Sequence, residues 1–70
     1  MSSFFDMLIT FVAVAEKGSF SAAARSLGKA QSGVSTTISN LEIDLGVELF
    51  DRTHRTPELT PAGRALLREA

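Results

Sequence analysis

The chain has 70 residues, with seven Lys and Arg, eight Asp and Glu, one His and no Cys, for a formal net charge of −1. That length holds one small domain at most, and so small a core favours a partner chain or a longer parent protein. An apolar share of 44% with 21% charged residues is typical of a folded globular domain, and the lack of Cys excludes a disulfide framework or a thiolate zinc site.

The first predicted helix covers about residues 4 to 17. Its apolar residues recur at the i, i+3, i+4, i+7 spacing of an amphipathic helix, beginning with Phe4. Ser3 with Asp6 three residues later resembles a capping box, and Gly18 is typical of a helix end. We expect the apolar face of this helix, Phe4 included, to be core.

A second, shorter helix is predicted where Phe20, Ala23, Ala24 and Leu27 repeat the apolar pattern, and Ser19 or Ser21 can be its N-cap. Gly28 follows and can end it.

The third predicted helix runs from about Gln31 to Leu45, with Gly46 as its C-terminal cap. It is separated from the second helix by a short turn that contains Gly28. Two helices joined in this way form a helix-turn-helix, whose second helix enters the major groove of DNA. We therefore expect a helix-turn-helix over about residues 21–40 and a recognition helix over 31–45.

The third helix has two different faces when its residues are placed at 100° intervals. The apolar sector consists of Val34, Ile38, Leu41 and Leu45, and the opposite sector of Ser32, Ser35, Thr36 and Ser39. Short hydroxyl side chains can bond phosphate oxygens or base edges and let a helix approach closely. Gln31, at the N-terminal end, could bond an adenine in two places, beside backbone N–H groups that favour phosphate. The alternative is a solvated helix face without a partner.

The segments VELFDR and TPELT can pair as a small hairpin, which would form a wing over about residues 49–60. Arg52, His54 and Arg55 on this wing could reach the DNA backbone or the narrow minor groove, where the negative potential attracts arginine. Alternatively, the two arginines are solvated or pair with nearby carboxylates, and Arg52 braces the wing. For His54 the alternative is a surface position without a role.

Thr60 and Pro61 predict the start of a fourth helix, with threonine as N-cap and proline at the first helical position. The pattern continues to the last residue without a C-cap, so this helix is expected to be truncated. The expected fold is mostly α: a winged helix-turn-helix of three helices, two strands and a fourth helix.

The whole pattern resembles the N-terminal winged helix-turn-helix domain of the LysR-type transcriptional regulators. The motifs that carry the resemblance are FVAVAEKGSFSAAARSLGKAQSGVSTTISNLEIDLGVELFDR and LTPAGRALL, within residues 4 to 70. The resemblance implies a DNA-binding domain over 4–60 and the start of a linker or dimerisation helix over 61–70. It also implies a cytoplasmic bacterial regulator of transcription that binds double-stranded DNA as a homodimer or homotetramer, of which this chain is a fragment.

Carried over by position, the resemblance assigns base contacts in the major groove to Gln31, Ser32, Ser35 and Thr36. It assigns phosphate contacts to Ser21, Ser39 and Asn40, and wing contacts over 52–56 to Arg52, Thr53 and Arg55. The family often has serine where this chain has Ala30, which should weaken the start of the helix by roughly 1 kcal/mol. It often has arginine where Thr36, Ser39 and Asn40 stand, so we expect weaker binding and no guanine-rich site.

Other classes of protein fit the sequence less well. With one histidine, no cysteine and scattered acidic residues, we expect no enzyme, no cofactor and no metal. The longest apolar stretch, MLITFVAVA, has nine residues, so neither a membrane span nor a secretory signal is expected. A small-molecule inducer would act only through the missing C-terminal domain of the parent. The remaining alternative is a winged-helix module for protein–protein contact, because the fold alone does not fix the function.

Overall fold

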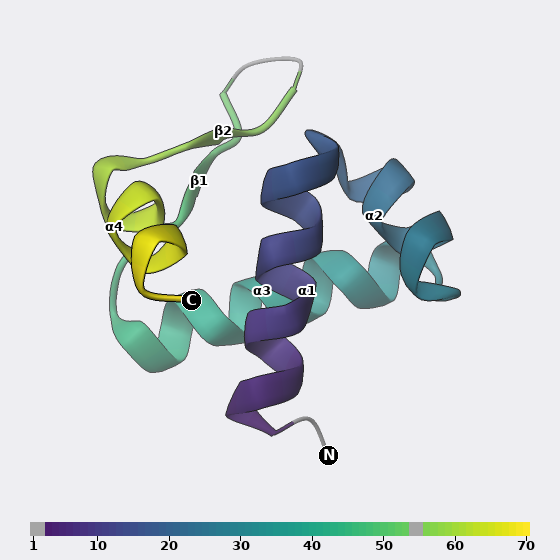
Figure 1. Ribbon diagram of the computed structural model, residues 1–70, viewed down its shortest axis with the longest axis horizontal. Helices are drawn as coiled ribbons and strands as arrows, with labels where there is room; N and C mark the ends of the chain where they lie inside the picture. Colours follow the sequence, from purple (N-terminus) through teal and green to yellow (C-terminus); the bar gives the residue numbers. More distant parts are fainter. Residues whose placement is uncertain (1–2, 54–55) are drawn as a thin grey trace.

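The chain forms four helices and a two-stranded antiparallel sheet in a computed structural model that describes residues 3–53 and 56–70. The elements in chain order are α1 (Phe4–Lys17), α2 (Phe20–Leu27), α3 (Gln31–Leu45), β1 (Phe50–Asp51), β2 (Glu58–Leu59) and α4 (Pro61–Glu69). In Figure 1, α1 crosses in front of α3, with α2 on one side and the hairpin and α4 on the other. The predicted winged helix-turn-helix is confirmed.

The helices begin where side-chain hydroxyls satisfy their first N–H groups. Ser3 Oγ accepts the N–H of Asp6 at 3.1 Å, as the capping pattern predicts. For α2 the N-cap is Ser19, whose Oγ accepts the N–H of Ala22 at 2.9 Å. Ser21, the other candidate for this cap, lies inside the helix and keeps its hydroxyl available.

The turn between α2 and α3 is held by the backbone. Gly28 has φ +68°, a left-handed conformation that favours glycine, and the N–H of Lys29 bonds the carbonyl of Ala24 at 2.9 Å. This closure lets the chain reverse within three residues, so that α2 packs directly on α3.

The core is formed by α1, α2, α3 and the start of the wing. Its buried residues are Met7, Phe11, Val14, Ala23, Ala24, Val34, Ile38, Leu41, Leu49 and Phe50. The Phe50 ring lies 5.5 Å from the Phe11 ring and 5.8 Å from the Phe20 ring, between centroids. Phe50 therefore anchors β1 against both α1 and the start of α2.

Two residues predicted to be core are exposed. Phe4 is 50% and Leu45 39% accessible, although each continues the apolar spacing of its helix. Phe4 lies in the first turn of α1 and Leu45 in the last turn of α3, where each helix extends past its packing partners. A helical wheel treats all turns alike and misses this difference between a helix centre and its ends.

The wing is joined to α4 through Thr60. The strands pair Phe50 with Leu59, and the N–H of Thr60 then bonds the carbonyl of Leu49 at 3.0 Å. The Thr60 hydroxyl donates to the carbonyl of Glu48 at 2.6 Å and accepts the N–H of Gly63 at 3.0 Å, so the predicted N-cap of α4 also bonds the segment before β1.

Candidate nucleic-acid interface

The outer side of α3 is lined by short polar side chains. Gln31, Ser32, Thr36 and Asn40 are exposed, and Ser35 and Ser39 are half-buried on one flank of this face. Ile43, 75% accessible, continues the same side into the last turn of the helix. The predicted candidates on α3 therefore share one surface. Ser35 and Ser39 are less accessible than expected for residues placed opposite the apolar sector of the helix.

The hydroxyl groups of the chain fall into two sets. In the described ranges, those that make an intramolecular hydrogen bond belong to Ser3, Thr10, Ser19, Thr37, Thr53 and Thr60. Within the same ranges, no such bond is made by Ser21, Ser32, Ser35, Thr36 or Ser39, the five hydroxyl residues of α2 and α3 that the sequence assigns to DNA. Because hydroxyls both donate and accept, this face can bond an external partner without breaking a bond in the protein.

The N-terminus of α3 has no side-chain cap. Ala30 occupies the N-cap position in extended geometry, and within the described residues no side chain accepts the N–H groups of the first turn. The missing cap is thus as the sequence predicts, and the weaker helix start expected from it remains a prediction. These N–H groups carry the positive end of the helix dipole.

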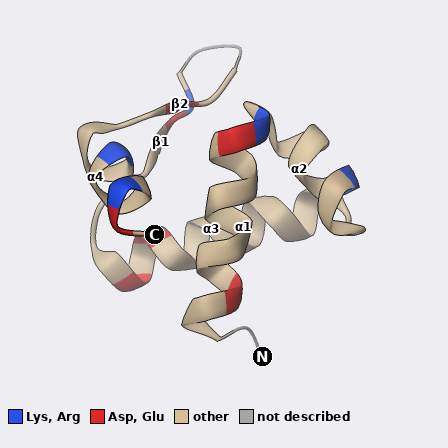
Figure 2. Ribbon diagram, in the orientation of Figure 1, with Lys and Arg blue, Asp and Glu red and all other residues tan. Residues whose placement is uncertain are grey.

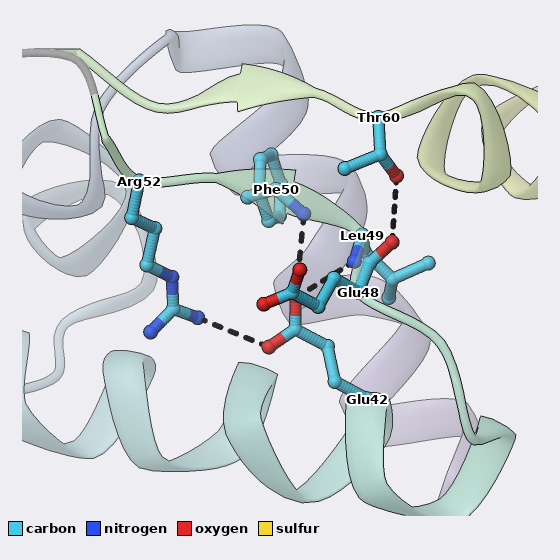
Figure 3. Close-up of polar contacts among 6 residues, drawn as sticks. All are labelled: Glu42, Glu48, Leu49, Phe50, Arg52 and Thr60. Atoms are coloured by element: carbon cyan, nitrogen blue, oxygen red, sulfur yellow. Dashed lines mark hydrogen bonds and ion pairs between the residues drawn. The ribbon is translucent and has the colours of Figure 1, made fainter.

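Glu42 connects α3 to the wing with one carboxylate (Figure 3). Its Oε2 accepts the N–H of Leu49 at 2.7 Å and of Phe50 at 3.3 Å, and its Oε1 lies 3.4 Å from an Arg52 nitrogen. The Arg52 guanidinium carbon also lies 4.9 Å from the centre of the Phe20 ring. These contacts hold β1 over the last turns of α3 and against the start of α2.

The role of Glu42 in holding the wing against α3 is not among the sequence predictions. The available signal was its place in the L-E-x-x-L-G motif, directly after the buried Leu41.

The wing residues differ in availability. Arg52 is paired with Glu42, and its side chain remains 37% accessible. Thr53 folds back on Asp51, whose Oδ1 accepts both the backbone N–H at 3.0 Å and the hydroxyl at 2.6 Å. Arg55 and His54, the other wing candidates, lie outside the described residues.

Charge is distributed unevenly around α3. From Lys17 to Leu41 the chain has three basic residues and no acidic one, and both Arg25 in the last turn of α2 and Lys29 in the turn before α3 are exposed. The C-terminal part of α3 carries Glu42 and Asp44 instead, and Figure 2 shows acidic segments there and basic ones on α2 and α4. An anionic partner is therefore favoured at the N-terminal half of α3 and disfavoured at its C-terminal end.

Residues 3–53 and 56–70 contain neither a candidate metal site nor a candidate membrane span. No three His, Cys, Asp or Glu side chains there are grouped so that they could hold a metal ion. No helix in those ranges has the length and apolar character needed to cross a bilayer.

Three helices, a glycine turn, a hairpin and a fourth helix in this order define a winged helix-turn-helix domain. The profile described as bacterial regulatory helix-turn-helix protein, lysR family, matches residues 5–64. The chain belongs to this family, as the resemblance predicts.

The curated relatives are transcriptional regulators. The HTH-type transcriptional regulator AceR of Acinetobacter baumannii is 56% identical over 61 residues, which is 87% of this chain and 20% of the relative. The regulator ClcR of Pseudomonas putida is 52% identical over 66 residues, 94% of this chain and 22% of the relative. The chain thus spans about a fifth of the length of these proteins.

Solved structures agree with this assignment. A crystal structure of a CbnR DBD–DNA complex superposes with a TM-score of 0.90 at 45% identity, covering 96% of this chain and 77% of that chain. A BenM DBD/benA site 1 DNA complex gives a TM-score of 0.92 at 39% identity, covering 96% of this chain and 75% of that one.

Proposed function

We propose that this chain is a sequence-specific, double-stranded DNA-binding domain of a LysR-type transcriptional regulator. The observation that carries the proposal is the outer face of α3, where hydroxyls without intramolecular bonds adjoin an uncapped helix start and basic neighbours. The two DNA complexes among the structural relatives support the same function.

In this proposal the N-terminal half of α3 enters the major groove. Base edges are read by Gln31, Ser32, Ser35 and Thr36, and phosphates are bound by Ser21, Ser39 and Asn40. With no Lys or Arg on α3 itself, the base contacts are hydroxyl and amide bonds, which favours A·T-rich sequence over guanine runs.

The wing lies beside α3 at the minor groove or the backbone. Thr53 and Arg55 remain predicted contacts there. Because the Arg52 guanidinium is bonded to Glu42 and lies over Phe20, we assign Arg52 first to holding the wing in place, and its own DNA contact stays a prediction.

Self-association is proposed through α1 and α4. Phe5 is 69% and Ile9 43% accessible on the outer face of α1, and both line an apolar hollow to which Ala70 contributes. Exposed apolar groups of this size favour a protein partner. We propose that residues 61–70 begin the linker helix that pairs two chains, giving a homodimer or homotetramer of the parent.

The same proposal covers the rest of a full-length regulator. A small-molecule inducer would bind outside residues 1–70 and change the spacing of the DNA-binding domains. The regulator would act in the cytoplasm, as a transcription factor without catalytic activity.

The function is tested by adding a short A·T-rich duplex to isotope-labelled protein at low salt and following the amide signals by NMR. Shifts are expected at Ser21, over 31–39 and over 53–56, and they should fade as salt rises, since phosphate contacts release counterions. A G·C-rich duplex of equal length provides the control for sequence preference.

If the protein remains folded and these amides do not shift with either duplex, the DNA-binding proposal fails. A winged-helix module for protein–protein contact would then be the better interpretation. Equal shifts with both duplexes would contradict sequence-specific recognition but not DNA binding.

A further inference from the structure

Gly33 stands at an exposed position in the first turn of α3, where the protein itself gives no reason for glycine. The glycines with positive φ are Gly18, Gly28 and Gly46, so the backbone at Gly33 is one that any L residue can adopt. A Cβ atom added there would meet no heavy atom within 4 Å, so neighbouring side chains do not require the gap either.

Gly63 provides the contrast within the same chain. A Cβ atom on Gly63 would collide with the carbonyl oxygen of Leu49 and approach the Leu59 side chain to 2.9 Å. Packing therefore accounts for the glycine in α4 and leaves the one in α3 unexplained.

Glycine at this position weakens the helix. It is among the residues least compatible with helix formation, and α3 already lacks a side-chain cap at Ala30. Two weakening features at one helix start can result from neutral drift, or from a binding partner whose surface needs the space.

The neighbours of Gly33 favour the second explanation, a binding partner. Gly33, Thr36 and Asn40 follow one another at i, i+3, i+7 and are all exposed, so they form one row on the outer face of α3. The hydroxyl of Thr37, next to this row, donates to the carbonyl of Gly33 one turn earlier, at 2.8 Å. The row therefore consists of short side chains, and its first residue, Gly33, has none.

We propose that Gly33 sets how closely α3 approaches DNA, because the missing side chain lets the first turn contact the duplex directly. This inference rests on the proposed DNA-binding function. It predicts that filling the gap separates two properties: the protein becomes more stable while its affinity for DNA falls.

The test compares Gly33→Ala and Gly33→Leu with the unchanged protein. Both should raise the thermal unfolding midpoint, by about 2–6 °C, because both residues are better helix formers. The DNA probe is a duplex that the unchanged protein selects from a random-sequence library. Affinity for this duplex, measured by fluorescence anisotropy, should fall by about tenfold for the alanine variant and further for the leucine variant.

Ser26→Ala is the matched control. Ser26 is exposed near the C-terminal end of α2 and makes no side-chain hydrogen bond within the described residues. This variant should raise the unfolding midpoint without changing DNA affinity, which shows that added helix stability alone does not weaken binding.

Each outcome decides one question. If the unchanged protein selects and binds a duplex and both Gly33 variants bind it equally well, Gly33 has no role in the approach to DNA. If the unchanged protein binds no duplex, the proposed function itself fails and this inference fails with it.

Discussion

The carboxylate of Glu42 accepts the backbone N–H of Leu49 at 2.7 Å and thereby fixes the first strand of the wing to the last turns of α3. The carbonyl of the same residue accepts the N–H groups of Gly46 at 2.8 Å and Val47 at 3.2 Å. Glu42 thus ends the helix with its backbone and holds the returning chain with its side chain. Glu42 is therefore one of the residues that set the orientation of the wing relative to the recognition helix, together with the packing of Phe50 on Phe11 and Phe20.

Glu42→Ala should destabilise the domain by about 1–3 kcal/mol, because the N–H groups of Leu49 and Phe50 lose their acceptor in a largely buried place. Glu42→Gln should cost less, since one oxygen can still accept, although the ion pair to Arg52 is lost. Urea unfolding measures both. Glu48→Ala removes an exposed carboxylate on the same segment and should change stability by less than about 0.5 kcal/mol. Equal effects of the alanine variants at 42 and 48 would refute the special role of Glu42.

Gly63→Ala should also destabilise the domain, by about 2 kcal/mol or more, although alanine is the better helix former. The added methyl group would collide with the Leu49 carbonyl oxygen, so α4 must shift away from the wing. The free energy of unfolding is the measurement. Ala65→Gly, at an exposed position of the same helix, should cost only the difference in helix propensity, about 1 kcal/mol. A neutral Gly63→Ala variant would show that α4 does not pack this closely.

Ala30→Ser should stabilise the domain by about 1 kcal/mol, because it supplies the hydroxyl acceptor that the first turn of α3 lacks. The matched variant is Ser19→Ala, which removes the acceptor of the Ala22 N–H and should cost a similar amount. Thermal or urea unfolding should therefore move in opposite directions for the two variants. Loss of stability in Ala30→Ser would mean that the N-terminus of α3 has another geometry.

Gln31→Ala and Arg55→Ala should separate base reading from phosphate attraction. The first should reduce the ratio of affinities for preferred and unrelated duplexes, since Gln31 is the predicted adenine contact. The second should weaken binding to every sequence and lower the dependence of log K on log salt by about one unit. Anisotropy titrations across a range of salt concentrations measure both. If neither variant changes binding, the DNA face is assigned to the wrong surface.

The sequence predicts the helices well because each depends on nearby residues. The apolar spacing of α1, the serine caps and the terminal glycines act within one or two turns, and the predicted bounds agree with the structure. The hairpin could be placed as well, because its two strands are short and close in sequence.

The contacts that hold the elements together could not be predicted in this way. Glu42 meets its partners seven, eight and ten residues further along the chain, and only after the turn at Gly46 has brought β1 back over α3. In the sequence, Arg52 is compatible both with DNA contact and with bracing the wing. The choice depends on where the Glu42 carboxylate and the Phe20 ring lie, which is a property of the folded chain.

Asp44→Asn should raise affinity for all duplexes by about two- to threefold at low salt, and less at physiological salt. Asp44 is exposed near the C-terminal end of α3, a helix without any Lys or Arg, so its charge repels an approaching phosphate backbone. The free energy of unfolding should increase by about 0.5 kcal/mol or less, because an acidic residue is unfavourable at a helix C-terminus. Glu16→Gln on α1 removes the same charge from a helix outside the proposed interface and should have a smaller effect on binding. An equal gain from both variants would mean that only net charge matters, whereas a gain confined to Asp44→Asn would place the DNA beside α3.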